Sequence, residues 1–272
     1  TFCGVLRVLM LFVAGVVVVA ILLGKSPMTL FAGLGATSAV LMLVFKDTIL
    51  GLAAGVRLTS NDMLHKGDWI TVKSVDANGI VEDMSLTTVK VRNFDNTIVT
   101  ISPATLVNGS FQNWIGMQKS GGRRVKRIVY FDFRSIRLVD ETLKQTLLDK
   151  HFATEDSFKL KESLQKAIEK DIQEGKDIED LKNPAALAPT NLQLYRRFME
   201  KYLRQRPEVN TELTLMVRHM EATQCGLPIE FYFFIKDKVW VNYEHILADI
   251  MEHAYALANE FGLKIYEQYP EQ

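Results

Sequence analysis

The sequence predicts membrane-spanning helices followed by a β-rich domain and an α+β domain. Two long stretches, 8–23 and 26–45, carry no charged residue, and almost every charge lies after Phe45. From residue 66 to residue 101, short alternating strand patterns are separated by turn signals. From Arg123 onward, strand patterns mix with helical ones, as in an α+β domain.

Composition excludes several classes of protein. The chain has 272 residues with 32 basic and 32 acidic ones, so its net charge predicts no nucleic-acid partner. Cys3 and Cys225 are far apart and are expected to be free thiols. The five histidines are scattered and no glycine-rich phosphate loop is present, so we expect no enzyme, no metal and no cofactor. Because the chain starts at Thr1 beside an apolar segment, we expect further sequence upstream.

Residues 1–24 are predicted to form a transmembrane helix. The uncharged stretch 8–23 covers roughly 24 Å as a helix, slightly less than the ~30 Å hydrocarbon core. Arg7 and Lys25 extend the span because their long side chains reach the two interfaces. A buried core helix and a signal peptide are the alternatives. Apolarity on all faces and a run of valines favour a helix that faces lipid.

Residues 28–59 are predicted to form a second helix of a different kind, with a break near 46–48. Gly35 and Ala39 are four residues apart, so they share a face, and small residues let helices approach closely in a membrane. One chain offers too few helices for such packing, so copies of the chain are the expected neighbours. The charged break either faces water or a pore, or marks the exit from the bilayer.

After the break, residues 49–58 are expected to form an amphipathic helix near the inner interface. Arg57 lies at the end of this helix and His65, Lys66 and Lys73 follow it, whereas the loop on the other side has only Lys25. This excess of basic residues predicts that the C-terminal body is cytoplasmic.

Residues 60–120 are predicted to form a small β barrel or sandwich of the Sm-like kind. A hairpin turn is expected at Asp76–Gly79, because Asn-Gly is a strong turn signal. The expected strands are Trp69–Val72, Ile80–Met84, Thr88–Arg92 and Thr97–Ile101.

Residues 121–272 are predicted to form the α+β domain, interrupted by a charged insertion at about 155–207. The charged composition of 155–182 and the breaks at Asn183-Pro184 and Ala188-Pro189 suggest this insertion. The expected strands are Val125–Phe133, Glu212–His219, Pro228–Ile235 and Leu263–Tyr266. The expected helices are Ser135–Lys150 and Asn242–Phe261.

Four stretches in order resemble the small-conductance mechanosensitive channel (MscS) family: Phe45–Val56, Lys66–Ile70, Gly79–Val91 and Asn96–Pro103. The first resembles the hinge and inner half of the family's pore helix, and the others resemble its β domain. The charged insertion and the Lys46-Asp47 pair most resemble the miniconductance channels of the YbdG type.

The resemblance implies a homoheptameric channel in the bacterial inner membrane, with several spans and a cytoplasmic C-terminal vestibule. Membrane tension would open it to release ions and small solutes during hypo-osmotic stress. The implied partners are membrane lipids, copies of the chain and the permeating ions.

Alignment on Leu52-Ala-Ala-Gly55 assigns the family's constricting positions to Leu43 and Ala39, and its hinge glycine to Asp47. The expected pore-lining residues are therefore Gly35, Ala39, Leu43 and Asp47. Lys46 and Asp47 form the expected hinge, and Gly51, Ala54 and Gly55 are the expected helix-packing residues. The chain departs from the family in having a small residue at the upper constriction and a carboxylate at the hinge. Asp47 would either form an acidic ring or pair with Lys46 or a neighbour's Arg57.

A second class of function fits the same features. A membrane-anchored oligomeric scaffold or osmosensor would use the small-residue helix only for assembly, and would carry a cytoplasmic binding module without conductance. Current in a reconstituted bilayer separates the two classes.

Overall fold

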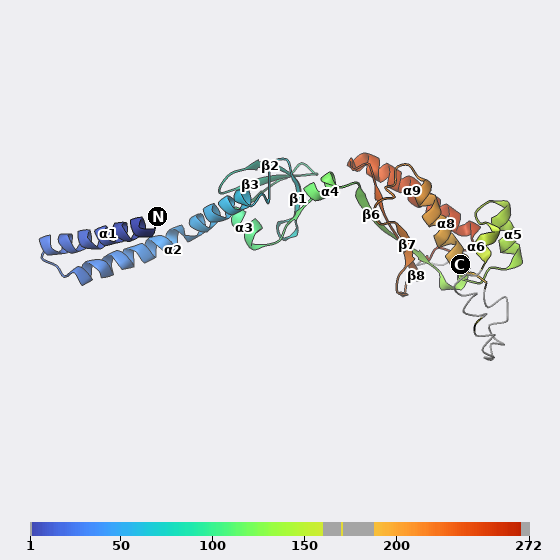
Figure 1. Cartoon of the computed structure of the whole chain (residues 1–272), viewed down its shortest axis with the longest axis horizontal. Helices are drawn as coiled ribbons and strands as arrows, with labels where there is room; N and C mark the ends of the chain where they lie inside the picture. The colour runs from blue at the N-terminus through green and yellow to red at the C-terminus, as the bar shows by residue number, and fades with distance from the viewer. Residues whose placement is uncertain (1, 160–169, 171–187, 268–272) are drawn as a thin grey trace. The chain divides into compact units, whose positions relative to one another are not determined.

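A computed structural model describes residues 2–159, 170 and 188–267. The chain divides into two compact units, Thr1–Ile115 and Gly116–Gln272 (Figure 1). Each unit has its own hydrophobic core. The N-terminal unit holds two long helices and a β domain, and the C-terminal unit is an α+β domain, so the predicted fold class is confirmed.

The N-terminal unit begins with two long apolar helices, α1 (Phe2–Leu22) and α2 (Pro27–Ser60). They lie side by side in Figure 1, and Gly24 (φ +61°) lies in the turn between them. Both are long and apolar enough to cross a membrane, and their most apolar windows are 6% and 0% buried. Such exposed apolar surface requires a covering in the assembled protein.

The predicted break at 46–48 is wrong, because α2 is helical without interruption from Pro27 to Ser60. Lys46, Asp47 and Thr48 lie inside it. The physical reason is that charge does not remove a backbone hydrogen bond. Only proline or an inserted group does that, and the next proline after Pro27 is Pro103.

The β domain is one antiparallel sheet of five strands in the order β4-β3-β2-β1-β5. Alternate residues of β3 (Val89, Val91) are buried against a core that also includes Leu58 at the end of α2. Each of the four predicted strands is found within one or two residues, except that β2 begins earlier. The strands are β1 (Trp69–Val72), β2 (Ala77–Met84), β3 (Val89–Asn93), β4 (Ile98–Ile101) and β5 (Gln112–Asn113).

The β1–β2 hairpin was predicted correctly, but its turn was placed three residues too late. The chain reverses at η1 (Lys73–Val75) and at Asp76, which has a positive φ of 52°. Gly79 is already a strand residue. A Cβ there would lie 1.9 Å from the carbonyl oxygen of Arg92 on β3, so the glycine permits close strand approach and does not form the turn.

The C-terminal unit is built on a three-stranded antiparallel sheet in the order β6-β8-β7. Alternate residues of β8, among them Phe231 and Phe233, are buried in a core shared with helices α8 and α9. The elements are α4 (Ile115–Lys119), β6 (Arg123–Phe131), η2 (Phe133–Ser135), α5 (Glu141–Asp149), α6 (Glu155–Phe158), α8 (Asn191–Gln205), β7 (Met216–His219), β8 (Leu227–Ile235) and α9 (Trp240–Glu260).

Two predicted elements of this unit are shorter than expected. The helix expected from Ser135 begins only at Glu141, where the Asp140 side chain accepts a hydrogen bond from the Leu143 amide. The strand expected at Leu263–Tyr266 is reduced to one isolated bridge, between Ile265 and Phe131.

The insertion predicted at about 155–207 is wrong over its last part. Helix α8 places Tyr195, Met199 and Leu203 in the core with no exposed surface. The Tyr195 hydroxyl donates a hydrogen bond of 2.6 Å to the backbone oxygen of Ala254 on α9. Residues 191–205 therefore belong to the domain itself, while 160–169 and 171–187 lie outside the described residues.

Of the two cysteines expected to be free thiols, Cys225 is an exposed free thiol. The side chain of Cys3 lies outside the described part of the chain. In the residues that the structure describes, no three His, Cys, Asp or Glu side chains are grouped as a metal site would require.

Candidate pore helix

Helix α2 begins where its sequence dictates. The Ser26 side chain accepts a hydrogen bond of 3.3 Å from the Thr29 amide, and Pro27 occupies the first turn, where a missing N–H costs nothing. With 34 residues the helix is about 50 Å long, well beyond the ~30 Å of a hydrocarbon core. One part of α2 therefore suits a membrane and another part lies outside it.

The end of α2 packs on the β domain of its own chain. Ala54, Gly55 and Leu58 are its buried residues. A Cβ on Gly55 would lie 2.3 Å from the carbonyl oxygen of Leu86, in the turn between β2 and β3. Gly55, which the sequence predicts to be a helix-packing residue, thus lies against the β domain of its own chain.

The part of α2 that carries the expected pore positions is exposed in the single chain. Gly35, Ala39, Leu43 and Asp47 are all exposed, and 74% of the Leu43 surface is accessible. A Cβ on Gly35 or Gly51 would meet no atom within 4 Å. This stretch therefore has room for a neighbour.

Helix geometry sorts these residues into faces. At 3.6 residues per turn, Leu43 lies about 40° from both Ala39 and Asp47, so the three share one sector. Gly35 and Gly55 are 20 residues apart, which turns them about 200° from each other. In a regular helix, the face that meets the β domain at Gly55 is therefore opposite to the face that carries Gly35.

Asp47 also borders a cavity of about 490 Å³ within the N-terminal unit. Its polar lining includes Thr48 from α2, Thr87 from the β2–β3 turn, and Ser102 and Asn108 from the ends of α3 (Pro103–Asn108). The expected hinge residue thus lies beside the β domain. Lys46 does not line this cavity.

Sequence analysis missed α3, which packs along α2. Its signal was present in Ser102-Pro103. The Ser102 side chain accepts a hydrogen bond of 3.2 Å from the Thr105 amide, and proline follows at the first helical position. The predicted strand ended at Ile101, and no element was predicted for residues 103–108.

Comparison with known proteins identifies this arrangement. Residues 47–116 match the family model described as mechanosensitive ion channel, beta-domain. Over this segment the chain is similar to mechanosensitive ion channels. The match covers the second half of α2 and the whole β domain, which are the parts joined at Gly55. The family is one of channels and not of enzymes.

Two curated relatives come from Methanocaldococcus jannaschii. The small-conductance mechanosensitive channel MscMJ is 34% identical over 84 residues, covering 31% of this chain and 23% of the relative. The large-conductance channel MscMJLR is 29% identical over 142 residues, covering 52% of this chain and 39% of the relative. The chain therefore spans less than half of the length of either relative.

Among solved structures, the closed-state crystal structure of Helicobacter pylori MscS has a TM-score of 0.55 with 13% identity. The match covers 99% of this chain and 81% of that one. At this identity the likeness shows the fold, which consists of N-terminal apolar helices, a β domain and an α+β part.

Proposed function

We propose that the chain is a subunit of a mechanosensitive ion channel, opened by membrane tension to release ions and small solutes during hypo-osmotic stress. The observation that carries the proposal is the direct joining of the family's β domain to a long apolar helix with an uncovered face. No residue in the most apolar window of α2 is buried, and this same helix continues into the matched segment at residue 47.

The proposed assembly is a homoheptamer in which α2 of each subunit lines the pore. Exposed small residues at Gly35 and Ala39 support close packing between copies, since small side chains let helix backbones approach. The apolar surface of α1 suits contact with lipid. Packed side by side, seven α2 helices would leave one sector of each facing the axis.

Leu43 is the proposed constriction. A ring of leucine side chains closes a narrow pore because water is expelled from an apolar constriction. Ala39, one turn earlier, leaves the upper position wider than a bulky residue would. Asp47, one turn later, would add a ring of carboxylates that favours cations. Lys46 and Asp47 remain the proposed hinge, although α2 is continuous there in this structure.

The contact at Gly55 supports a route for force. Because the helix end lies against the Leu86 backbone, movement of α2 within the bilayer would be transmitted to the β domain. The basic residues that follow α2 favour a cytoplasmic position for both soluble parts in the inner membrane. The Lys46-Asp47 pair favours the miniconductance subtype.

Proteoliposomes loaded with K⁺ and diluted into hypo-osmotic buffer provide the test. We expect K⁺ efflux that grows with the size of the osmotic step and exceeds that of protein-free liposomes. Efflux no faster than from protein-free liposomes at every step would contradict the proposal and favour the scaffold or osmosensor.

The role of Asp47 is tested separately by Asp47→Asn, with Asp83→Asn as the matched control. Asp83 is an exposed carboxylate on β2, so its loss removes the same charge away from the proposed pore. We expect Asp47→Asn alone to shift the reversal potential in a K⁺ gradient toward zero. An unchanged reversal potential would remove Asp47 from the pore.

A further inference from the structure

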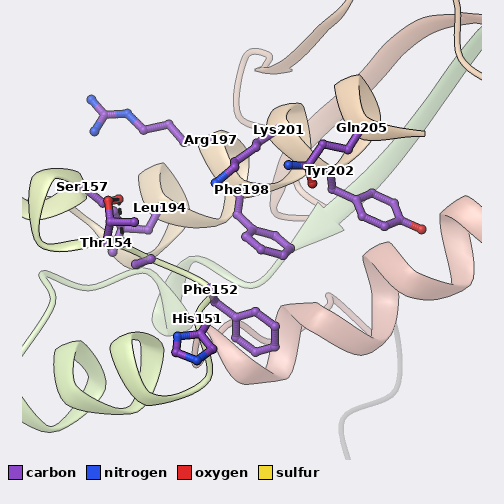
Figure 2. A pocket seen from close by; sticks show the side chains of 11 residues that line it. His151, Phe152, Thr154, Ser157, Leu194, Arg197, Phe198, Lys201, Tyr202 and Gln205 are labelled. Carbon is purple, nitrogen blue, oxygen red and sulfur yellow. Dashed lines mark hydrogen bonds between the residues drawn. The ribbon is translucent and has the colours of Figure 1, made fainter. Parts of the chain in front are cut away.

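The C-terminal unit contains a pocket that the proposed function does not use. It has a volume of about 330 Å³ and is lined by one face of α8 and by the segment from His151 to Ser157 (Figure 2). This volume is at the lower end of the range for small-molecule sites.

The pocket is positively charged. Arg197 and Lys201 lie four residues apart on α8, and none of the lining residues is an aspartate or glutamate. Glu200, next to Lys201 in sequence, does not line the pocket. Its carboxylate accepts a hydrogen bond of 3.0 Å from the Val217 amide on β7. Within the described part of the chain, neither Arg197 nor Lys201 forms an ion pair.

The floor of the pocket is aromatic and fixed. The rings of Phe152 and Phe198 meet edge to face with centroids 5.2 Å apart. Both rings also contact Phe261, which is fully buried, at 5.9 and 5.7 Å. The two rings lie at 74° to each other, so together they offer one ring face and one ring edge with a defined geometry.

Some polar groups at the edge of the pocket already form hydrogen bonds within the chain. The hydroxyls of Thr154 and Ser157 lie 3.2 Å apart and are engaged in a capping box at the start of α6. Figure 2 shows the Lys201 and Gln205 side chains on the α8 side of the pocket and the Arg197 guanidinium extended at the rim, away from the rings.

We propose that this pocket binds a small organic anion with a flat apolar body, such as an aromatic carboxylate. The carboxylate pairs with Lys201 and with Arg197 after the Arg197 side chain turns inward from the rim. The flat body stacks on one of the Phe152 and Phe198 rings and meets the edge of the other. The site is independent of conduction, so it stands or falls separately from the channel function.

Binding of 1-naphthoate and 1-naphthamide to the full chain in nanodiscs, measured by equilibrium dialysis, tests the proposal. The two probes have the same aromatic body, but only naphthoate carries a charge. We expect saturable binding of naphthoate, with naphthamide about tenfold weaker, because two exposed ion pairs of about 0.7 kcal/mol each correspond to tenfold.

The double variant Arg197→Gln/Lys201→Gln is expected to bind naphthoate about tenfold more weakly and to lose the preference over naphthamide. Arg204→Gln is the matched control, since Arg204 is an exposed cation of α8 outside the pocket lining, and it should leave both affinities unchanged. Higher salt should weaken naphthoate binding only in proteins that keep Arg197 and Lys201.

Two results would overturn the proposal. The first is the absence of saturable naphthoate binding to the wild-type chain. This result is expected if another part of the protein fills the pocket. The second is equal naphthoate affinity in the wild type and the double variant, which would assign the binding to the bilayer or to another surface.

Discussion

Substitution of Gly55 by alanine tests the contact between α2 and the β domain. A Cβ at this position would lie 2.3 Å from the oxygen, 3.0 Å from the carbon and 3.1 Å from the Cα of Leu86. All three are backbone atoms, so no flexible side chain can move aside. The helix or the β2–β3 turn must withdraw by about 1 Å to restore ordinary contact distances.

Two opposing effects set the magnitude. Alanine stabilises a helix interior by about 1 kcal/mol relative to glycine. Overpacking of this kind costs typically 1–3 kcal/mol. We therefore expect Gly55→Ala to lower the free energy of unfolding by about 1 kcal/mol, or about 5 °C in the melting temperature of the N-terminal unit.

Tryptophan fluorescence during thermal unfolding in detergent is a suitable assay, because Trp69 and Trp114 stack at 4.6 Å inside the β domain. Gly51→Ala is the matched control, since a Cβ at Gly51 meets nothing within 4 Å. It should keep or slightly raise the melting temperature. If Gly55→Ala were as stable as Gly51→Ala, the close approach of Leu86 to the helix would be refuted.

Three further predictions concern the soluble parts. Gly79→Ala should lower the free energy of unfolding by about 3 kcal/mol in urea titrations, because its Cβ would lie 1.9 Å from the Arg92 carbonyl oxygen. An unchanged urea midpoint would disprove the β2–β3 register. Asn191→Ala should lower the free energy of unfolding by about 3 kcal/mol in the same titrations. The buried Asn191 amide donates hydrogen bonds to two backbone carbonyls and accepts them from two backbone N–H groups. A decrease of less than 1 kcal/mol would contradict that network. Tyr195→Phe should cost about 1 kcal/mol near pH 7 by removing the hydrogen bond to Ala254. Burial raises the pKa of Tyr195 above its usual 10, so wild-type stability should fall above pH 10, where the unfolded phenol ionises first, and Tyr195→Phe should show a smaller fall.

Local patterns were enough to predict most of the elements. The uncharged stretches identify α1 and α2, and alternation such as Val89-Lys-Val91 identifies the β strands, because burial repeats with the period of the element. The position of Gly79 was misjudged because Asn-Gly is a turn signal only when no neighbouring strand needs the glycine. That need depends on strand register, which a local pattern does not contain.

Two other errors came from reading charge as structure. Lys46 and Asp47 were taken to interrupt α2, although a helix tolerates charged residues wherever their side chains point outward. The predicted insertion was based on the charged stretch 155–182 but was extended to about residue 207, so it included helix α8. Its buried positions, Tyr195, Met199 and Leu203, are nonetheless spaced by four residues, which is the period of a core-facing helix.

The candidate site was predictable only in part. The spacing of Ala39, Leu43 and Asp47 places them in one sector of α2, and the continuous helix agrees with that spacing. Their roles as constriction and hinge came from the family resemblance. The contact of Gly55 with Leu86 was not predictable, because it joins residues of different elements whose approach depends on the folded β domain.

Patch-clamp recording from reconstituted bilayers under stepwise suction tests the central claim most directly. The wild-type protein should be silent at rest and should open at a defined tension. Leu43→Ser should open at lower tension, because a polar ring no longer expels water from the constriction. The absence of tension-dependent current in both proteins would contradict the assignment of this chain as a channel subunit.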